Sequence, residues 1–293
     1  TKLQLKNKKG FVIKMKIGAR AHDYGRFSPD ELAKTIKAAG FDCIQLAVAK
    51  SLIGVSGATG TLNPGLCYDI RRAFEKHDVQ IAVLGCYIEP SIEDDEQRRK
   101  NIEKFCHQLS YASQMGTYIV ATETTRFSSP EQDRAKMFAI LTDSVLRMTE
   151  QAEKFGVFVG IEPVAEHTLN SPELTYRLIN AVKSPNLKIV FDPVNMLLPS
   201  TVKNQDDMWD SCFQAFGEQI VAFHAKDINL EGGSFVDANI GCGIVNYPKL
   251  MGWLAKNKPG INILREHVIP ESAHIDIANL KKLIADAEQN ANQ

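Results

Sequence analysis

The chain has 293 residues, of which 44% are hydrophobic and 24% charged, and its formal net charge is −1 at pH 7. This composition is typical of a folded globular protein and excludes extended disorder. The near-neutral charge argues against nucleic acid as a partner, because non-specific affinity for nucleic acid depends on Lys and Arg side chains that neutralise phosphates.

Cysteine usage and hydropathy favour a cytoplasmic protein. The six cysteines are scattered without a C-x-x-C pair, which indicates neither a disulfide framework nor a zinc knuckle. The basic first ten residues lead into no apolar stretch of signal-peptide length, and no run in the chain is long enough to span a membrane. We therefore expect reduced thiols, a cytoplasmic location and no membrane partner.

The first half of the chain alternates short apolar runs with helical patterns. A capping box at Ser28–Glu31 and the pair Asn63-Pro64 predict the starts of two helices, because such side chains accept hydrogen bonds from the free amides of the first turn. A third helix is expected over 95–115, and a fourth is expected to begin at Ser129–Gln132. The intervening strands are expected at 12–20, 41–48, 81–87 and 118–124.

Four apolar runs in the second half each end in a side chain that can bind a metal. Such runs, separated by helical patterns, are typical of buried parallel strands, and polar groups at their carboxyl ends lie where these sheets hold ligands. The runs are V-F-V-G-I-E-P, K-I-V-F-D-P-V-N, I-V-A-F-H-A-K-D and I-N-I-L-R-E-H, and they carry Glu162, Asp192, His224 and Glu266. Helices are expected from Ser171-Pro172, around Met208–Phe216, from Asn246 and over 275–289.

This alternation of strands and helices predicts a parallel α/β sheet. Because ligands from four consecutive strands must meet at one site, we expect the sheet to close into a (β/α)8 TIM barrel. The barrel is expected to form a single domain over residues 1–293, with 1–11 as an N-terminal extension. The glycine-rich stretch 228–245 is expected to be a long loop at the open end.

Two Glu, one Asp and one His form a mostly oxygen ligand set. Such a set suits a hard or borderline divalent ion, with Mn²⁺ as the first expectation and Mg²⁺ or Co²⁺ as alternatives. Zn²⁺ is a further alternative, although zinc more typically takes additional nitrogen or sulfur ligands. Because side chains alternate along a strand, His224 and Lys226 should share one face, whereas Asp227 should face away or begin a loop.

A divalent ion at this place favours proton transfer next to a carbonyl. The ion would chelate neighbouring oxygens of a sugar and polarise the carbonyl, which acidifies the adjacent C–H. Carboxylates on both sides of that carbon can remove and return the proton, which gives isomerisation or epimerisation. Glu162 and Glu266 form the natural catalytic pair for this chemistry.

Several of these motifs resemble a known family. The E-P at 162, D-P-V-N at 192, H-A-K-D at 224, G-C-G-I-V-N-Y-P at 241 and R-E-H at 266 resemble the xylose isomerase-like TIM barrels, the sugar phosphate isomerase/epimerase superfamily. L-G-C-Y-I-E-P at 84–90 and A-T-E-T at 121–124 extend the likeness over nearly the whole chain. The superfamily includes ketose 3-epimerases, hydroxypyruvate isomerase, inosose isomerases and dehydratases, and endonuclease IV.

The resemblance implies roles for individual residues. Glu162, Asp192, His224 and Glu266 match the family's metal ligands, and Glu162 with Glu266 match the carboxylates that shuttle the proton in the ketose epimerases. The substrate-binding candidates are His22, Glu123, His167, Asn195 and Lys226. Family members are often dimers or tetramers, which implies a homo-oligomer that acts on a small sugar or polyol.

Two positions depart from the epimerase pattern. Asn195 stands where the family often has a substrate-binding His, and Leu230 stands where epimerases often have an Arg. His167, in the loop after the Glu162 strand, is a candidate for the missing contact. These departures leave the metal chemistry unchanged but weaken an assignment to the ketose 3-epimerases.

Alternative functions stay open beside a sugar or polyol isomerase/epimerase. An inosose-type dehydratase would use the same base, with Lys226 or His167 as the acid. An endonuclease IV-like enzyme would need a multi-zinc cluster with several more His ligands, yet the chain has seven His in all. A non-catalytic sugar-binding barrel is a further alternative. The Gly241–Gly243 segment is either a flexible loop or a phosphate-binding turn, and Cys86 is expected to be a small buried residue.

Overall fold

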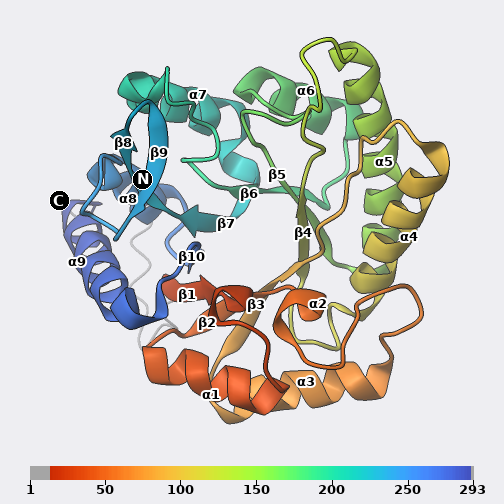
Figure 1. Ribbon diagram of the computed structural model, residues 1–293, viewed down its shortest axis with the longest axis horizontal. Coiled ribbons are helices and arrows are strands. Elements are labelled where there is room, and N and C mark those ends of the chain that lie inside the picture. The colour runs from red at the N-terminus through yellow and green to blue at the C-terminus, as the bar shows by residue number, and fades with distance from the viewer. Residues whose placement is uncertain (1–13, 292–293) are drawn as a thin grey trace, which may run out of the picture.

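The computed structural model describes residues 14–291, and its centre is a closed barrel of parallel strands (Figure 1). The strands follow the order β1-β10-β7-β6-β5-β4-β3-β2 around the barrel, which confirms the predicted (β/α)8 TIM barrel. The expected extension over residues 1–11 lies outside the described residues. The barrel strands are β1 (Lys16–Arg20), β2 (Cys43–Leu46), β3 (Gln80–Gly85), β4 (Ile119–Glu123), β5 (Phe158–Glu162), β6 (Leu187–Phe191), β7 (Ile220–Ala225) and β10 (Asn262–Arg265).

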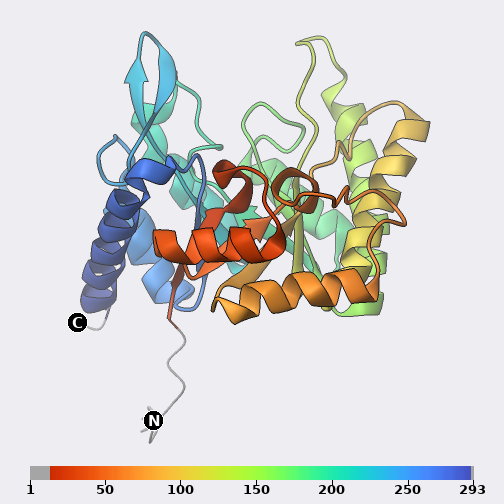
Figure 2. The same cartoon turned by 60° about the horizontal axis from the view of Figure 1, so that its bottom comes forward.

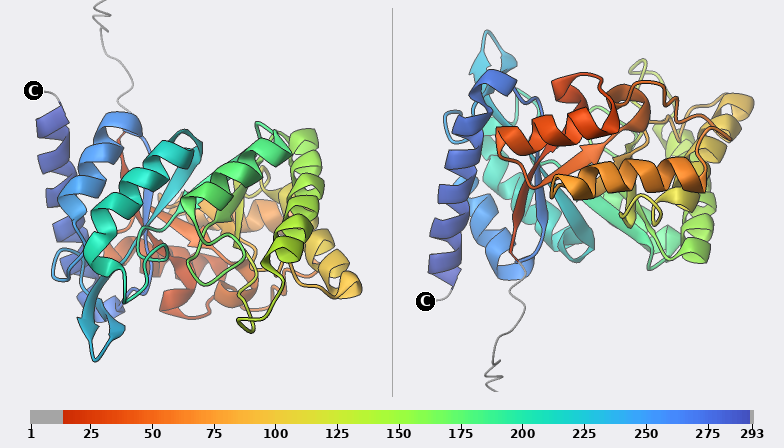
Figure 3. Two further views of the ribbon diagram at one scale, coloured as in Figure 1. Left: turned by 90° about the horizontal axis from the view of Figure 1, so that it is seen from above. Right: turned by 90° about the horizontal axis from the view of Figure 1, so that it is seen from below.

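Helices surround the barrel on its outside (Figures 1 and 3). They pack on the outward faces of the strands and bury most of the apolar core there. The long helices are α1 (Pro29–Ala39), α3 (Pro64–Lys76), α4 (Asp95–Tyr111), α5 (Arg134–Phe155), α6 (Pro172–Val182), α7 (Gln205–Phe216), α8 (Tyr247–Asn257) and α9 (Ala273–Ala291). Shorter helical turns are α2 (Val48–Ser51), η1 (Ala21–Tyr24), η2 (Val202–Asn204), η3 (Gly217–Gln219) and η4 (Pro270–Ser272).

Helix starts follow the predicted caps with one exception. Ser28 forms the predicted capping box with Glu31, and Asn63, Ser171 and Asn246 cap their helices as expected. The prediction for the helix after β4 was wrong, because α5 begins at Arg134 with Asp133 as its cap. Asp133 accepts a hydrogen bond from Lys136 N at 2.9 Å, whereas Ser129–Gln132 forms a separate turn before the helix.

Small apolar side chains fill the barrel interior below the polar residues. Val190, Ala222 and Leu264 each stand two residues before a predicted ligand and belong to one buried cluster inside the barrel. Gly160 stands two residues before Glu162, and a Cβ there would lie 3.0 Å from Val190 and 3.1 Å from Ala121. Because the side-chain period of a strand is two, the ligand residues above this cluster also point inward.

The stretch 228–245 is only partly the long loop that we expected. Its first part forms an antiparallel hairpin of β8 (Asp227–Glu231) and β9 (Ser234–Ala238), which projects from the end of the barrel at which the strands finish (Figures 2 and 3). Gly232 and Gly233 both have positive φ, 57° and 82°, which suits a tight two-residue turn. A two-residue glycine turn between alternating runs is a hairpin signal, and this stretch of the sequence carries it.

Neither a membrane-spanning helix nor a disulfide bond occurs in residues 14–291. No helix within residues 14–291 is long and apolar enough to cross a membrane. All six cysteines lie within this range, and each has a free thiol. Cys86 is buried, as expected, and burial raises the pKa of its thiol to about 12.

Candidate metal centre

Three buried side chains meet at the carboxyl end of the barrel. Glu162 is the last residue of β5, Asp192 follows β6, and His224 lies in β7. One potential ligand atom from each lies within 4.8 Å of the others, and all three side chains are buried. Within the described part of the chain, this is the one group of three or more His, Cys, Asp or Glu side chains with such geometry.

Glu266, the fourth predicted ligand, approaches the same imidazole. It follows β10, which pairs with β7 on the side opposite to β6. His224 Nδ1 lies 3.3 Å from Glu162 Oε2 and 3.4 Å from Glu266 Oε1. One ring nitrogen therefore faces two carboxylates, which come from strands on either side of β7.

The D-P-V-N turn after β6 orients the Asp192 carboxylate. Val194 N and Asn195 N donate hydrogen bonds to Asp192 Oδ1 at 2.8 Å and 3.0 Å. These two bonds hold Oδ1 against the backbone. The other oxygen, Oδ2, is directed at the centre, where it lies 2.9 Å from Lys226 Nζ.

Lys226 places an ammonium group in the middle of this cluster. Its Nζ lies 2.9 Å from Asp192 Oδ2, from Glu266 Oε2 and from Asn195 Oδ1. It shares the inward direction of His224, as the alternation of the strand predicted. Burial alone would lower the pKa of Lys226, but the charges of Asp192 and Glu266 outweigh burial and raise it, so the amine stays charged.

The same network controls the charges of His224 and Glu266. Burial disfavours the imidazolium, but the carboxylates of Glu266 and Glu162 outweigh it and raise the pKa of His224 to about 9. Burial would likewise raise the pKa of Glu266, but the charges of Lys226 and His224 hold it well below its usual range. Glu266 therefore stays ionised at neutral pH.

The donor set fits a divalent cation. Glu162 and Asp192 offer oxygen atoms and His224 offers a nitrogen, which suits a hard or borderline ion. His224 Nδ1 and Asp192 Oδ2 are buried and make no hydrogen bond, although Asp192 Oδ2 forms an ion pair with Lys226 at 2.9 Å. A cation held between them would provide a partner for both atoms.

Sequence comparison places this barrel in a family. Residues 33–285 match the family described as Xylose isomerase-like TIM barrel. The chain belongs to the xylose isomerase-like TIM barrel family. An inosose isomerase of Bacillus velezensis is 26% identical over 165 residues, which are 54% of this chain and 55% of that protein. The present chain thus spans about half the length of this curated relative.

Solved structures share the fold of this xylose isomerase-like barrel. A D-tagatose 3-epimerase-like protein superposes with a TM-score of 0.75 at 17% identity, over 94% of this chain and 99% of that one. A xylose isomerase-like TIM barrel protein from Mycobacterium smegmatis, in complex with magnesium, has a TM-score of 0.74 at 15% identity, over 94% of this chain and 98% of that one. At these identities the likeness concerns the fold.

Three of the predicted substrate-binding residues lie at or beside the centre of this xylose isomerase-like barrel. Asn195 donates to Glu162 Oε1 at 2.6 Å and accepts from Lys226, so it joins the cluster directly. Glu123 ends β4 and pairs in register with Glu162. Burial and the nearby charges of Glu162 and Glu266 raise the pKa of Glu123 to about 7.

The other two predicted substrate-binding residues lie at the rim. His167 Nδ1 is 3.8 Å from Glu123 Oε2, and burial lowers the pKa of His167. His22 lies in η1 and makes a T-shaped ring contact with Tyr87, with ring centroids 5.9 Å apart. Burial, together with the charge of Arg20, lowers the pKa of His22 to about 4.

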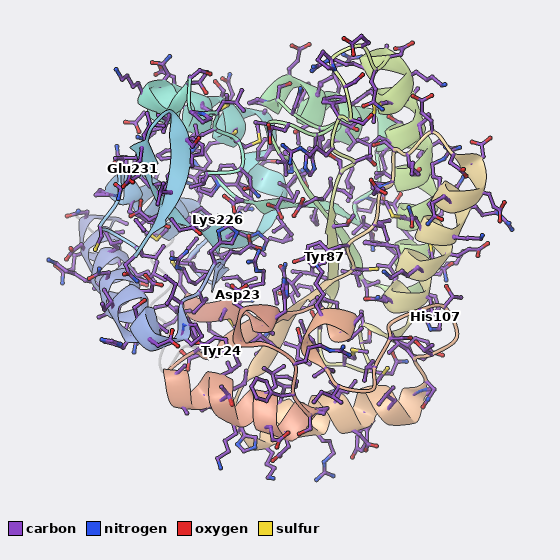
Figure 4. The ribbon with its side chains drawn as sticks, in the orientation of Figure 1. Asp23, Tyr24, Tyr87, His107, Lys226 and Glu231 are labelled. Carbon is purple, nitrogen blue, oxygen red and sulfur yellow. The ribbon has the colours of Figure 1, made fainter. Side chains whose placement is uncertain are left out.

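The structure also brings in three residues to which the sequence analysis assigned no role. Arg20 Nη1 lies 3.4 Å from Glu266 Oε2, and Arg20 also pairs with Asp23 at 2.8 Å. Gln45 contacts His224, and Tyr87 contacts Gln45. Figure 4 shows Tyr87 and Lys226 on facing sides of the barrel opening. Arg20 stands at the end of a strand, as the predicted ligands do, and Gln45 is a polar residue within an apolar run. Both positions could therefore be recognised as candidates in the sequence.

The Gly241–Gly243 segment is not free to bind a phosphate in this xylose isomerase-like barrel. Asp227 Oδ2 accepts hydrogen bonds from Gly241 N at 2.8 Å and Gly243 N at 3.0 Å, and Oδ1 accepts from Val245 N at 3.2 Å. The carboxylate already occupies the amides that a phosphate would need. Asp227 thus holds the loop that follows the hairpin, and the phosphate-turn alternative is wrong.

Proposed function

We propose that this protein is a divalent-metal-dependent isomerase or epimerase of sugars or polyols. The observation that carries the proposal is the approach of Glu162 and Glu266 to one imidazole nitrogen, 3.3 Å and 3.4 Å away, from opposite sides of His224. Two carboxylates beside one cation site are the groups needed to remove and return a proton at a single carbon. The family membership agrees with this chemistry.

Glu162, Asp192 and His224 would hold the ion, with Glu266 as a fourth ligand. A bound divalent ion supplies Lewis acidity, which polarises a substrate carbonyl and lowers the pKa of the C–H beside it. Mn²⁺ is the ion we propose first. Mg²⁺ is the leading alternative, since a structural relative is described in complex with magnesium.

The remaining steps belong to the chain's own side chains. For inversion, the ionised Glu266 would take the proton from the carbon, and Glu162 would have to carry the proton that it gives to the opposite face. Return of the proton to the neighbouring carbon would give isomerisation instead. Lys226 stays charged between Asp192 and Glu266, so it stabilises negative charge that develops on the substrate oxygen.

Asn195, Glu123 and His167 are proposed to bind the substrate hydroxyls. Asn195 is held between Glu162 and Lys226, which places its amide beside both the proposed base and the ammonium. Glu123 lies beside the centre at the end of β4, and His167 is its neighbour at the rim, in the loop after β5. His22 is proposed as a further contact from the opposite part of the rim.

The alternatives are less well supported. A dehydratase would require Lys226 or His167 to protonate a leaving hydroxyl, yet the Lys226 ammonium is engaged by three partners at 2.9 Å. An endonuclease IV-like enzyme would require a larger metal cluster, and residues 14–291 contain one candidate group with a single His. A non-catalytic barrel would bind the metal but would not catalyse proton exchange with any sugar or polyol.

The test is proton exchange in D₂O. The full chain, loaded with Mn²⁺ or Mg²⁺, is incubated with a panel of ketoses, aldoses and inososes, and deuterium incorporation is followed by NMR. Deuterium at one carbon of one substrate is the expected result and identifies both the substrate and the reaction. Metal binding without exchange in any panel member would contradict the isomerase proposal.

A further inference from the structure

A buried glutamine contacts the metal-facing histidine from across the barrel. Gln45 lies in β2 and is 2% exposed. Its Oε1 lies 2.8 Å from His224 Nε2 in β7, although the two residues are 179 positions apart in the chain and two strands, β1 and β10, stand between β2 and β7. We propose that Gln45 is a positioning residue that keeps His224 in the form that ligates the cation. This inference rests on the proposed metal site.

The argument starts from the hydrogen on the imidazole. An amide oxygen only accepts hydrogen bonds, so His224 Nε2 must carry the hydrogen that lies between it and Gln45. A neutral imidazole with hydrogen on Nε2 has its lone pair on Nδ1, which is the nitrogen that faces Glu162 and Glu266. The contact therefore selects the tautomer whose lone pair points at the cation site.

Tyr87 contacts the other end of the Gln45 amide. Gln45 Nε2 donates a hydrogen bond to the Tyr87 hydroxyl at 3.0 Å, so the amide nitrogen is directed away from the imidazole. Tyr87 itself makes a T-shaped ring contact with His22, and Lys50 Nζ lies 4.0 Å from the centre of the phenol ring. Both ends of the amide are thus engaged, which holds the Gln45 side chain between Tyr87 and His224.

Burial makes this arrangement functionally informative. A buried amide costs free energy unless its polar atoms form hydrogen bonds. An apolar side chain at the third position of C-I-Q-L in β2 would need no such bonds. The partners of Gln45 are a side chain of the proposed metal centre and a phenol that is oriented towards the same opening. Residues that orient a metal-binding His through its second nitrogen typically contribute 10-fold to 100-fold to metal affinity.

The experiment measures Mn²⁺ affinity of the full chain by calorimetry, and compares Gln45→Leu with Gln45→Glu. Gln45→Leu removes the acceptor and should weaken Mn²⁺ binding by about 10-fold to 100-fold. Gln45→Glu retains an acceptor for Nε2–H and should restore most of the affinity. Gln108→Leu is the matched control, because Gln108 is also 2% exposed but lies in α4 and contacts Gly57.

A second readout follows the imidazole directly. In the metal-free protein with a neutral His224 imidazole, ¹⁵N NMR should show hydrogen on Nε2 in the wild type and a mixed population of tautomers in Gln45→Leu. Unchanged Mn²⁺ affinity together with an unchanged tautomer in a folded Gln45→Leu variant would overturn the inference. Equal losses in Gln45→Leu and Gln108→Leu would also overturn it, because they would indicate a general effect of losing a buried amide.

The outcome separates this inference from the proposed reaction. If the wild type binds Mn²⁺, and Gln45→Leu weakens that binding, the positioning role stands even when no sugar exchanges deuterium. If sugars exchange deuterium but Gln45→Leu retains full Mn²⁺ affinity, the reaction stands and the positioning role fails.

Discussion

The ammonium of Lys226 and the carboxylate of Glu266 meet at 2.9 Å with both side chains nearly buried, 7% and 6% exposed. They come from neighbouring strands, since Lys226 follows β7 and Glu266 follows β10. The pair keeps the carboxylate ionised in an environment where burial would otherwise favour its protonated form. An ionised carboxylate beside a cation site is the state in which it can accept a proton from carbon.

The first prediction concerns Glu266 itself. Glu266→Gln keeps the size of the side chain but removes its ability to accept a proton, so kcat should fall by about 10²-fold to 10⁴-fold. Circular dichroism should show an intact fold. Exposed Glu271→Gln, a few residues along the same segment, is the control and should retain wild-type turnover. Wild-type kcat in a folded Glu266→Gln variant would exclude Glu266 as acid or base.

The second prediction concerns the charge balance of the centre. Lys226→Met leaves Asp192 and Glu266 buried without their cation, which should lower the free energy of unfolding of the metal-free protein by about 3–5 kcal/mol. Added Mn²⁺ should restore more stability in this variant than in the wild type, because the ion compensates the unpaired carboxylates. Thermal unfolding with chelator and with Mn²⁺ measures both effects. An Mn²⁺ response no larger than that of the wild type would contradict the proposed position of the ion.

The third prediction concerns the buried ion pair of Arg265 and Asp276, which involves the residue next to Glu266 in the chain. Arg265 Nε donates to Asp276 Oδ2 at 2.8 Å, and Asp276 Oδ1 accepts from Ile240 N at 2.7 Å, so β10, α9 and the end of the hairpin are joined. Arg265→Met leaves Asp276 buried without its partner, so chemical denaturation should show a loss of about 3–5 kcal/mol in the free energy of unfolding.

Two further variants check the cause of that loss. Arg265→Met combined with Asp276→Leu should recover part of it, because no unpaired charge then remains. Arg71→Met removes the exposed pair of Arg71 and Glu75 and should change stability by no more than about 0.5 kcal/mol. Asp276→Leu alone completes the comparison. If the double variant loses more free energy of unfolding than the two single variants together, packing and not charge dominates at Arg265.

The fourth prediction concerns pH. Burial and Arg20 lower the pKa of His22 to about 4 in the folded state, against about 6.5 in the unfolded chain. Below pH 6.5 the unfolded state therefore binds a proton that the folded state does not, so stability is lost as the pH falls from 6.5 to 4. His22→Gln should lose less stability over this range, measured by unfolding midpoints. His274→Gln, exposed on α9, should follow the wild type.

Local patterns were sufficient for much of this fold. Alternation along each strand fixes which side chains point inward, so Glu162, Asp192, His224 and Glu266 could be assigned to one end of the barrel before any contact was known. Helix starts with a single strong cap were also predictable. The start of α5 was not, because Ser129 and Asp133 both offer capping oxygens, and the choice between them depends on how the loop after β4 packs.

The sequence by itself determined the order of the elements, the inward faces of the strands and the candidate ligands, because these follow from periods and caps within one segment. Only the tertiary structure decided that Gln45 meets His224, that Arg20 reaches Glu266 and that Asp227 occupies the amides of Gly241 and Gly243. Such contacts join segments from different strands and loops, and their partners depend on how the barrel closes, which no local pattern records.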